Sequence, residues 1–237
     1  MSARTLSEPL RNPEISTVRA VHLDGPAGRL EALVNNGAPD APCAALVCHP
    51  HPLAGGTMHN KVAYHAMKVL NAPEWGLRWP VLRFNFRGAG LSEGTHEGRA
   101  ETCDVLAALE WVDTEYRLPV VVVGFSFGAA MALSACCDPS LRHALRANLR
   151  GLVALGLPTQ AFGHSLQYPF LSGCTLPKLF LSGDCDCFAP DADLKQVVNT
   201  AAIPRTLVLI PGADHSFSGQ IEAMQKSLSG WLKEHVQ

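Results

Sequence analysis

The chain has 237 residues, of which 47% are apolar and 17% are charged, and its 19 basic and 21 acidic side chains give a net charge of -2. This length predicts one domain, at most two, around a single hydrophobic core. Because the charged fraction lies below the usual value of about 25%, the composition argues against a long disordered tail and against nucleic acid as a partner.

The sequence has no stretch that approaches the roughly 18–20 consecutive apolar residues of a membrane span. Its first 16 residues carry charges and prolines in place of the apolar core of a signal peptide. We therefore expect a cytoplasmic protein with an N-terminal extension over residues 1–16 and one domain over residues 17–237. The eight cysteines form no CxxC pair and no regular spacing, so we expect most of them to be core residues in a reducing compartment.

Strand and helix patterns alternate along the chain from residue 18 onward. The first two strands, Val18–Asp24 and Arg29–Asn35, flank a Gly-Pro-Ala-Gly turn and predict an antiparallel hairpin. Six later segments are short and mostly apolar, as expected of parallel strands buried on both faces. They are Cys43–Cys48, Val81–Phe86, Pro119–Phe125, Leu152–Leu157, Leu176–Ser182 and Arg205–Ile210. Helical patterns lie at Lys61–Leu70, Ala100–Tyr116, Ser126–Cys137, Asp191–Thr200 and Ser216–His235.

This alternation predicts an α/β fold with a mostly parallel eight-stranded sheet, an N-terminal antiparallel hairpin and helices on both faces. The last predicted helix supports this fold. Its apolar residues recur at steps of three and four and so form one apolar stripe that can pack against the sheet. Ligands of such sheets bind beyond the carboxyl ends of the strands. The connection Pro158–Thr175 has only 18 residues, too few for a separate lid, so we expect no cap domain and an open site.

An apolar strand runs directly into Gly124-Phe125-Ser126-Phe127-Gly128 and then into a helix of small residues. This context is that of a nucleophile elbow, in which a serine occupies a strained turn and presents its hydroxyl at the end of the sheet. The alternative interpretation is a glycine-rich structural turn. Because both flanks match the elbow, we assign Ser126 as the catalytic nucleophile.

Serine is a weak nucleophile until a base accepts its proton, so a histidine should follow a later strand. His215 lies in a glycine-bearing loop between the strand Arg205–Ile210 and the last helix, and it is the predicted base. The alternative for His215 is a surface residue at the start of that helix. The other downstream histidines are interpreted as surface residues; they are His143, His164 and His235.

The acid that orients this histidine should follow the preceding strand, where Asp184 and Asp186 compete. We favour Asp186 because its place further along the loop lets the chain leave the sheet and turn back towards the histidine. Asp184 is interpreted as a turn residue that bonds its own backbone. Asp191 and Asp193 are interpreted as residues of the first turn of the next helix.

Acyl transfer also needs N–H donors for the developing oxyanion. The N–H of Phe127, directly after the nucleophile, is the first candidate. The second should come from the loop His49-Pro50-His51-Pro52-Leu53, where the prolines have no N–H and leave His51 or Leu53. We favour His51 because the flanking prolines fix the chain around its amide.

Two further motifs point to other chemistry but lack its full pattern. His49 and His51 form an H-x-H pair, yet no other ligand cluster accompanies them, so we expect no metal. The segment Asn85–Gly94 lacks the complete phosphate-loop and dinucleotide-binding patterns. We interpret it as a structural turn at the border of the site, in which Arg87 ties neighbouring strand-end loops together.

The chain resembles the α/β-hydrolase superfamily, and in particular its small, lidless bacterial subgroup of predicted hydrolases. The resemblance spans about residues 17–235 and is carried by HPHPLAGGTMHNKV, FNFRGAGLSEG, GFSFG, GDCDCFAP and GADHSF. It implies the nucleophile–acid–base order Ser126, Asp186, His215, a donor position for His51, and replacement of the aspartate of a common turn motif by Asn85. The related dienelactone hydrolases use a cysteine nucleophile, so Ser126 separates the chain from that branch.

These residues predict hydrolysis of a small-molecule carboxylic ester through an acyl-enzyme on Ser126, with no metal or organic cofactor. A thioesterase, a peptidase or an amidase would use the same triad, and a binding protein that kept the fold without activity is a further alternative. Leu53, Phe188 and Phe217 neighbour the catalytic residues in sequence and are candidates for an apolar substrate wall, with core packing as the alternative.

Overall fold

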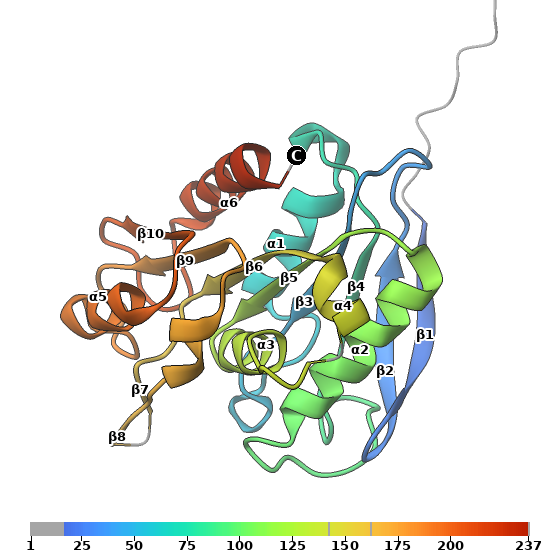
Figure 1. Ribbon diagram of the computed structural model, residues 1–237, viewed down its shortest axis with the longest axis horizontal. Helices are drawn as coiled ribbons and strands as arrows, with labels where there is room; N and C mark the ends of the chain where they lie inside the picture. Colours follow the sequence, from blue (N-terminus) through green and yellow to red (C-terminus); the bar gives the residue numbers. More distant parts are fainter. Residues whose placement is uncertain (1–16, 142, 162, 237) are drawn as a thin grey trace, which may run out of the picture.

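The structure is a computed structural model that describes residues 17–141, 143–161 and 163–236. The N-terminal extension expected over residues 1–16 lies outside the described residues. Eight strands form one sheet in the order β1-β2-β4-β3-β5-β6-β9-β10 (Figure 1). Their bounds are β1 Val18–Gly25, β2 Gly28–Asn35, β3 Ala44–Cys48, β4 Val81–Phe84, β5 Val120–Phe125, β6 Leu149–Leu155, β9 Lys178–Gly183 and β10 Arg205–Ile210.

Strand direction follows the expected pattern. β1 pairs antiparallel with β2, and β2 pairs antiparallel with β4. Every pair from β4 across to β10 is parallel. The sequence prediction of a mostly parallel eight-stranded sheet with an N-terminal hairpin is therefore confirmed, and the carboxyl ends of the parallel strands meet along one edge.

The central strand β5 shows why the strands are apolar along their whole length. Val120 and Val122 enter the core on one face of the sheet, while Val121 and Val123 enter the core on the other, because successive side chains of a strand point to opposite faces. Helices cover both faces (Figure 1). The first face carries α2 (Glu101–Tyr116), α3 (Phe127–Cys136) and α5 (Asp191–Thr200), and the second carries α1 (Lys61–Asn71) and α6 (Ile221–His235).

The last helix begins at Ile221, so the predicted start at Ser216 is wrong. The Asp214 carboxylate accepts the backbone N–H groups of Ser216 and Ser218 at 3.0 and 2.8 Å, and such side-chain bonds compete with helical ones. Phe217 has a φ of 53°, which is incompatible with a right-handed helix. The residues after the predicted base are therefore held in a turn.

The connection between β6 and β9 forms no lid in the part of it that the structure describes. It contains a short hairpin, β7 (Gln160–Ala161) and β8 (His164–Ser165), and a 3-10 turn, η3 (Pro169–Gly173). The sequence prediction did not include these elements, nor the short helix α4 (His143–Asn148) before β6. All are too short to carry a clear periodic pattern.

Most cysteines are core residues, as expected; the buried ones are Cys43, Cys48, Cys136, Cys137 and Cys174. Two of them nevertheless form a disulfide, which the sequence spacing did not predict. Cys137 follows α3 and Cys174 follows η3, and their Cα atoms lie 5.2 Å apart although 37 residues separate them along the chain. This bond joins the end of the helix that begins at the elbow to the connection after β6.

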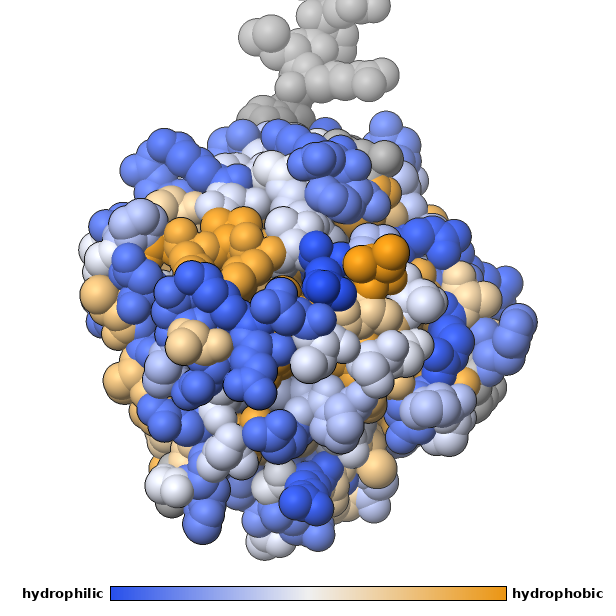
Figure 2. Space-filling view, turned by 60° about the vertical axis from the view of Figure 1, so that its left-hand side comes forward, coloured by the Kyte–Doolittle hydropathy of each residue, from blue (hydrophilic) through white to orange (hydrophobic). Residues whose placement is uncertain are grey.

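The outer strand β10 is only partly buried over its first five residues, and α5 and α6 contact it. Figure 2 brings this side of the molecule forward and shows a larger and a smaller apolar patch with polar surface between them. None of the described helices is long and apolar enough to cross a membrane.

Candidate active site

Ser126 occupies the sharp turn between β5 and α3, with a φ of 55° and a ψ of -120°. This conformation is strained for a residue with a side chain. It is maintained by main chain that packs closely against Gly124 and Gly128 on either side of the turn. A Cβ at Gly124 would lie 2.4 Å from the Gly128 carbonyl oxygen, and a Cβ at Gly128 would lie 2.4 Å from the His49 carbonyl oxygen. Both glycines are therefore required, and the elbow packs directly on the end of β3.

The three residues predicted as nucleophile, base and acid come together at the carboxyl edge of the sheet. His215 Nε2 lies 2.9 Å from Ser126 Oγ, and His215 Nδ1 lies 2.8 Å from Asp186 Oδ2. When Nδ1–H donates to the carboxylate, Nε2 is left to accept the serine proton. The Asp186 side chain is fully buried, that of His215 is 16% exposed and Ser126 is partly exposed, so the chain of hydrogen bonds runs from a buried acid to a serine that solvent can reach.

The Asp186 carboxylate has two further donors that fix its orientation. Oδ2 accepts the Ser182 hydroxyl at 3.0 Å, and Oδ1 accepts the backbone N–H of Phe188 at 2.9 Å. The sequence reasoning missed both donors, although a serine at the end of an apolar strand is a signal that could have identified Ser182. Asp184 instead accepts the N–H of Gly212 at 2.7 Å. It thereby joins the acid-bearing loop to the histidine-bearing loop, rather than bonding its own backbone as expected.

The two predicted oxyanion donors lie on either side of the elbow. Phe127 is the first residue of α3, and N–H groups in a first helical turn have no partner within the helix. His51 comes just before the turn η1 (Pro52–Ala54). The N–H of Leu53, the alternative donor, is directed to His51 Nδ1 at 3.2 Å. This bond favours His51 over Leu53 as the second donor.

His51 accepts that bond in its neutral form. Burial and the neighbouring His96 lower the pKa of His51, against the opposing effect of Glu101. An unprotonated Nδ1 is what the Leu53 N–H needs as an acceptor. The ring of His51 is thus part of the loop structure, while the predicted role of the residue belongs to its backbone.

His49 orients the peptide group that carries the His51 N–H. Its Nδ1 lies 2.6 Å from the Pro50 carbonyl oxygen, which belongs to the same peptide unit, and its Nε2 accepts the N–H of Phe86 at 3.0 Å. His49 has no exposed surface, and burial lowers its pKa to about 4. Both ring nitrogens are therefore occupied by the fold, and no group of three or more metal-binding side chains occurs in the described part of the chain.

Acid should destabilise the protein through His49. Between its unfolded pKa of about 6.5 and its folded pKa of about 4, the unfolded chain binds a proton that the folded chain does not. The free energy of unfolding should thus fall by up to about 3 kcal/mol as the pH drops from 6.5 to 4, in addition to the effects of other groups. Urea unfolding of the wild type and of His49→Gln at several pH values measures this. The variant should lose the extra pH dependence, and parallel curves for the two proteins would contradict the assignment.

The predicted substrate-wall residues occupy different environments. Leu53 is 79% exposed on the loop after β3, and Phe188 is 44% exposed with its ring centroid 4.7 Å from that of His215. Phe217 has no exposed surface and packs in the core beneath the site. Core packing therefore accounts for Phe217, whereas Leu53 and Phe188 are exposed, and Phe188 lies against His215.

The loop after β4 is held by two polar side chains. Asn85 accepts the N–H of Met58 at 2.8 Å and donates to Glu31 at 2.7 Å. Arg87 donates to the buried Asp104 of α2 at 2.7 Å and also reaches Glu97 at 2.9 Å. It was expected to tie strand-end loops together, but it joins its own loop to α2, and Asn85 makes the connections to other segments.

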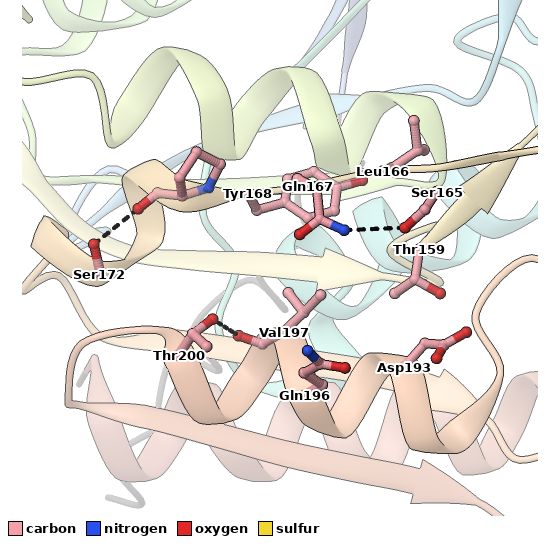
Figure 3. A pocket seen from close by; sticks show the side chains of 11 residues that line it. Thr159, Ser165, Leu166, Gln167, Tyr168, Ser172, Asp193, Gln196, Val197 and Thr200 are labelled. Atoms are coloured by element: carbon pink, nitrogen blue, oxygen red, sulfur yellow. Dashed lines mark hydrogen bonds between the residues drawn. The ribbon is translucent and has the colours of Figure 1, made fainter.

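A cavity of about 380 Å³ lies between residues 159–172 of the connection and helix α5 (Figure 3). None of the predicted site residues lines it. Several of its polar side chains already bond within the protein, as the Gln167–Ser165 and Ser172–Pro169 pairs illustrate. The connection does reach the acid loop, because Thr159 donates its N–H to the Phe188 carbonyl at 2.8 Å.

Comparisons with known proteins agree with the fold. The model of a family described as an alpha/beta hydrolase domain matches residues 53–235. An uncharacterized protein of Rickettsia prowazekii is 34% identical and covers 90% of this chain and 87% of its own length. A crystal structure from Xanthomonas campestris, described as an a/b serine hydrolase without lid, is 30% identical, with a TM-score of 0.76 and 96% and 97% of the two chains covered.

A second solved structure, an alpha-beta serine hydrolase homologue from Coxiella burnetii, is also 30% identical. It covers 90% of this chain and 96% of its own, with a TM-score of 0.75. Fold, strand order and family match therefore agree with the resemblance seen in the motifs. The chain belongs to the α/β-hydrolase superfamily.

Proposed function

We propose that the protein hydrolyses carboxylic esters through an acyl-enzyme on Ser126. The observation that supports this proposal is the continuous hydrogen-bond chain from Ser126 Oγ to His215 and on to the buried Asp186, at 2.9 and 2.8 Å. A nucleophile bonded to a base that is itself oriented by an acid is the arrangement that serine hydrolysis requires. No lid covers this sheet edge in the part of the chain that the structure describes, which suits direct access of a substrate to the site.

In the first half of the reaction, Ser126 Oγ attacks the acyl carbon while its proton moves to His215 Nε2. The carbonyl oxygen takes up the electron pair, and the N–H groups of His51 and Phe127 stabilise its charge. Collapse of this intermediate breaks the bond to the leaving oxygen, which takes the proton from His215 and departs as an alcohol. Asp186 keeps the imidazole oriented and stabilises its cation.

In the second half, water replaces the serine as the nucleophile. His215 accepts a proton from the water, whose oxygen attacks the acyl carbon, and the same two N–H groups stabilise the second oxyanion. Collapse breaks the bond to Ser126 Oγ, which recovers its proton from His215 as the carboxylic acid is released. Over the whole cycle, one ester and one water molecule become an alcohol and a carboxylic acid, and Ser126 and His215 return to their starting protonation states.

An ester is favoured because an alkoxide is a better leaving group than an amine, whose expulsion needs a better placed general acid. A thioesterase would use the same triad on another leaving group. The apolar groups at the rim, Leu53 and Phe188, suit the acyl part of any of these substrates, so the leaving group is the feature to vary in a test.

The test is a panel of short and medium p-nitrophenyl esters, acyl-CoA thioesters and aminoacyl amides, combined with labelling by a fluorophosphonate. We expect ester hydrolysis to dominate, and the label to map to Ser126 by mass spectrometry and to remove activity in proportion to the labelled fraction. Heat-unfolded protein should not be labelled. Absence of both ester hydrolysis and labelling would overturn the proposal, and a preference for thioesters or amides would change the substrate class.

A further inference from the structure

Three rings meet beside the elbow, and two of them belong to the proposed oxyanion donors. The His96 ring centroid lies 4.6 Å from that of His51 and 5.3 Å from that of Phe127. The His51 and Phe127 rings are themselves 5.0 Å apart. All three pairs are inclined by about 60°, within the range of distances and edge-on arrangements that aromatic pairs favour. His96 therefore contacts the side chains of both donors at once.

His96 is itself held from behind by a buried carboxylate. Its Nδ1 lies 2.7 Å from Glu101 Oε1, and the side chain of Glu101 has no exposed surface. The same oxygen accepts the N–H of Glu97 at 2.8 Å. Burial alone would raise the pKa of Glu101, but backbone N–H groups and the neighbouring His96 lower it below its usual value. The carboxylate is thus charged, and it holds the imidazole by close contact rather than by a hydrogen bond, since Nδ1 has no partner in hydrogen-bond geometry among the described residues.

The loop that carries His96 is also held by contacts with Arg87 and Gly88. Arg87 bonds both Glu97, at 2.9 Å, and the carbonyl oxygen of Ala100, at 3.0 Å. The backbone of His96 also packs closely on Gly88. A Cβ placed on Gly88 would lie only 3.0 Å from the His96 backbone nitrogen. The His96 ring is therefore a rigid support and not a mobile surface group.

We propose that His96, anchored by Glu101, is a positioning residue of the oxyanion hole. Its ring packs against the His51 and Phe127 rings, which also contact each other, and so keeps the two backbone N–H groups of these residues converging on one point. This inference rests on the proposed function. Small displacements of such donors are costly, since a misplacement of about 1 Å can reduce the rate by about 100-fold.

The variant His96→Ala tests this role with the best ester of the panel. We expect kcat to fall about 10- to 100-fold with little change in KM, because a hole formed around the transition state does not contribute equally to ground-state binding. The rate of phosphonylation of Ser126 should fall in parallel, since it needs the same N–H donors. His96→Phe keeps a ring but loses the contact with Glu101, so its loss of activity should be smaller than that of His96→Ala. Thr95→Ala, an exposed neighbour in the same loop, should behave as the wild type.

The outcomes separate this inference from the proposed function. If Ser126 is labelled in the wild type and the rates of His96→Ala are unchanged, the positioning role of His96 is overturned while the proposed function stands. Equal losses in His96→Ala and His96→Phe would also overturn it, because the nitrogens rather than the ring would then matter. Circular dichroism checks folding. If the alanine variant does not fold, His96→Val replaces it, because valine fills only part of the volume and should show a smaller loss in the same direction. If the wild type neither hydrolyses esters nor is labelled, the proposed function fails first.

Discussion

Replacement of Asp186 by asparagine should reduce kcat for ester hydrolysis by about 10⁴-fold while the fold is retained. The carboxylate accepts Nδ1–H of His215 at 2.8 Å. An asparagine that keeps its oxygen as the acceptor of the Phe188 N–H places its NH₂ group where Oδ2 was, facing the imidazole and the Ser182 hydroxyl. The histidine must then carry its proton on Nε2, where it cannot accept the proton of Ser126. Steady-state kinetics on a p-nitrophenyl ester, with circular dichroism as a check of folding, measure the effect.

Asp184→Asn is the matched control, because it makes the same chemical change two residues away. Asp184 accepts only a loop N–H from Gly212 and a weak bond from Cys185. An amide oxygen can replace it as an acceptor, so kcat should change by less than about tenfold, the cost of a modest loop displacement. A larger loss for Asp184→Asn than for Asp186→Asn would exchange the roles of the two aspartates.

The variant Arg87→Met should lower the free energy of unfolding by about 3–5 kcal/mol, the cost of breaking a buried ion pair by removing one partner. Arg87 is 5% exposed, and Asp104 has no exposed side-chain surface. The hydrogen bond with Asp104 raises the pKa of Arg87 against the effect of burial. Without the guanidinium, the Asp104 carboxylate keeps only the Arg87 backbone N–H, at 3.0 Å. Urea unfolding at neutral pH measures the difference.

An exposed ion pair provides the comparison. Arg29 lies 3.9 Å from Glu93, and both side chains are 55% exposed, so Arg29→Met should cost no more than about 1 kcal/mol. Equal midpoints for Arg87→Met and the wild type would contradict the buried-pair argument. A destabilised Arg87→Met that still binds and cleaves ester would show that the pair supports the fold rather than the chemistry.

The sheet could be predicted from the sequence because its signals are local and repeated. A strand such as β5 is apolar on both faces, and a strand followed by GxSxG and small residues leaves few arrangements open. The start of α6 could not be predicted in this way. Its apolar stripe continues back to Phe217, but two side-chain bonds from Asp214 hold that stretch in a turn, and hydrophobic periodicity does not register such bonds.

The candidate site, too, could be predicted from the sequence only in part. Ser126, Asp186 and His215 each follow a strand, so their order and position indicate that they meet at one edge. The contacts that hold them do not follow from position. Glu101 and His96 come from the start of a helix and the loop before it, and their approach to His51 depends on tertiary packing across the sheet edge. The disulfide between Cys137 and Cys174 was missed for the same reason.

The contact between Gly128 and the His49 carbonyl has an evolutionary consequence. It places the serine and the β3 loop at a separation set by main chain against main chain, so the spacing does not depend on side chains that vary. Leu53 and Phe188, at the open rim, make no part of that contact. Under the proposed function, successive substitutions at the rim would therefore change which acyl groups are accepted while the reacting atoms keep their places, so that new specificities would arise without passing through an inactive ancestor.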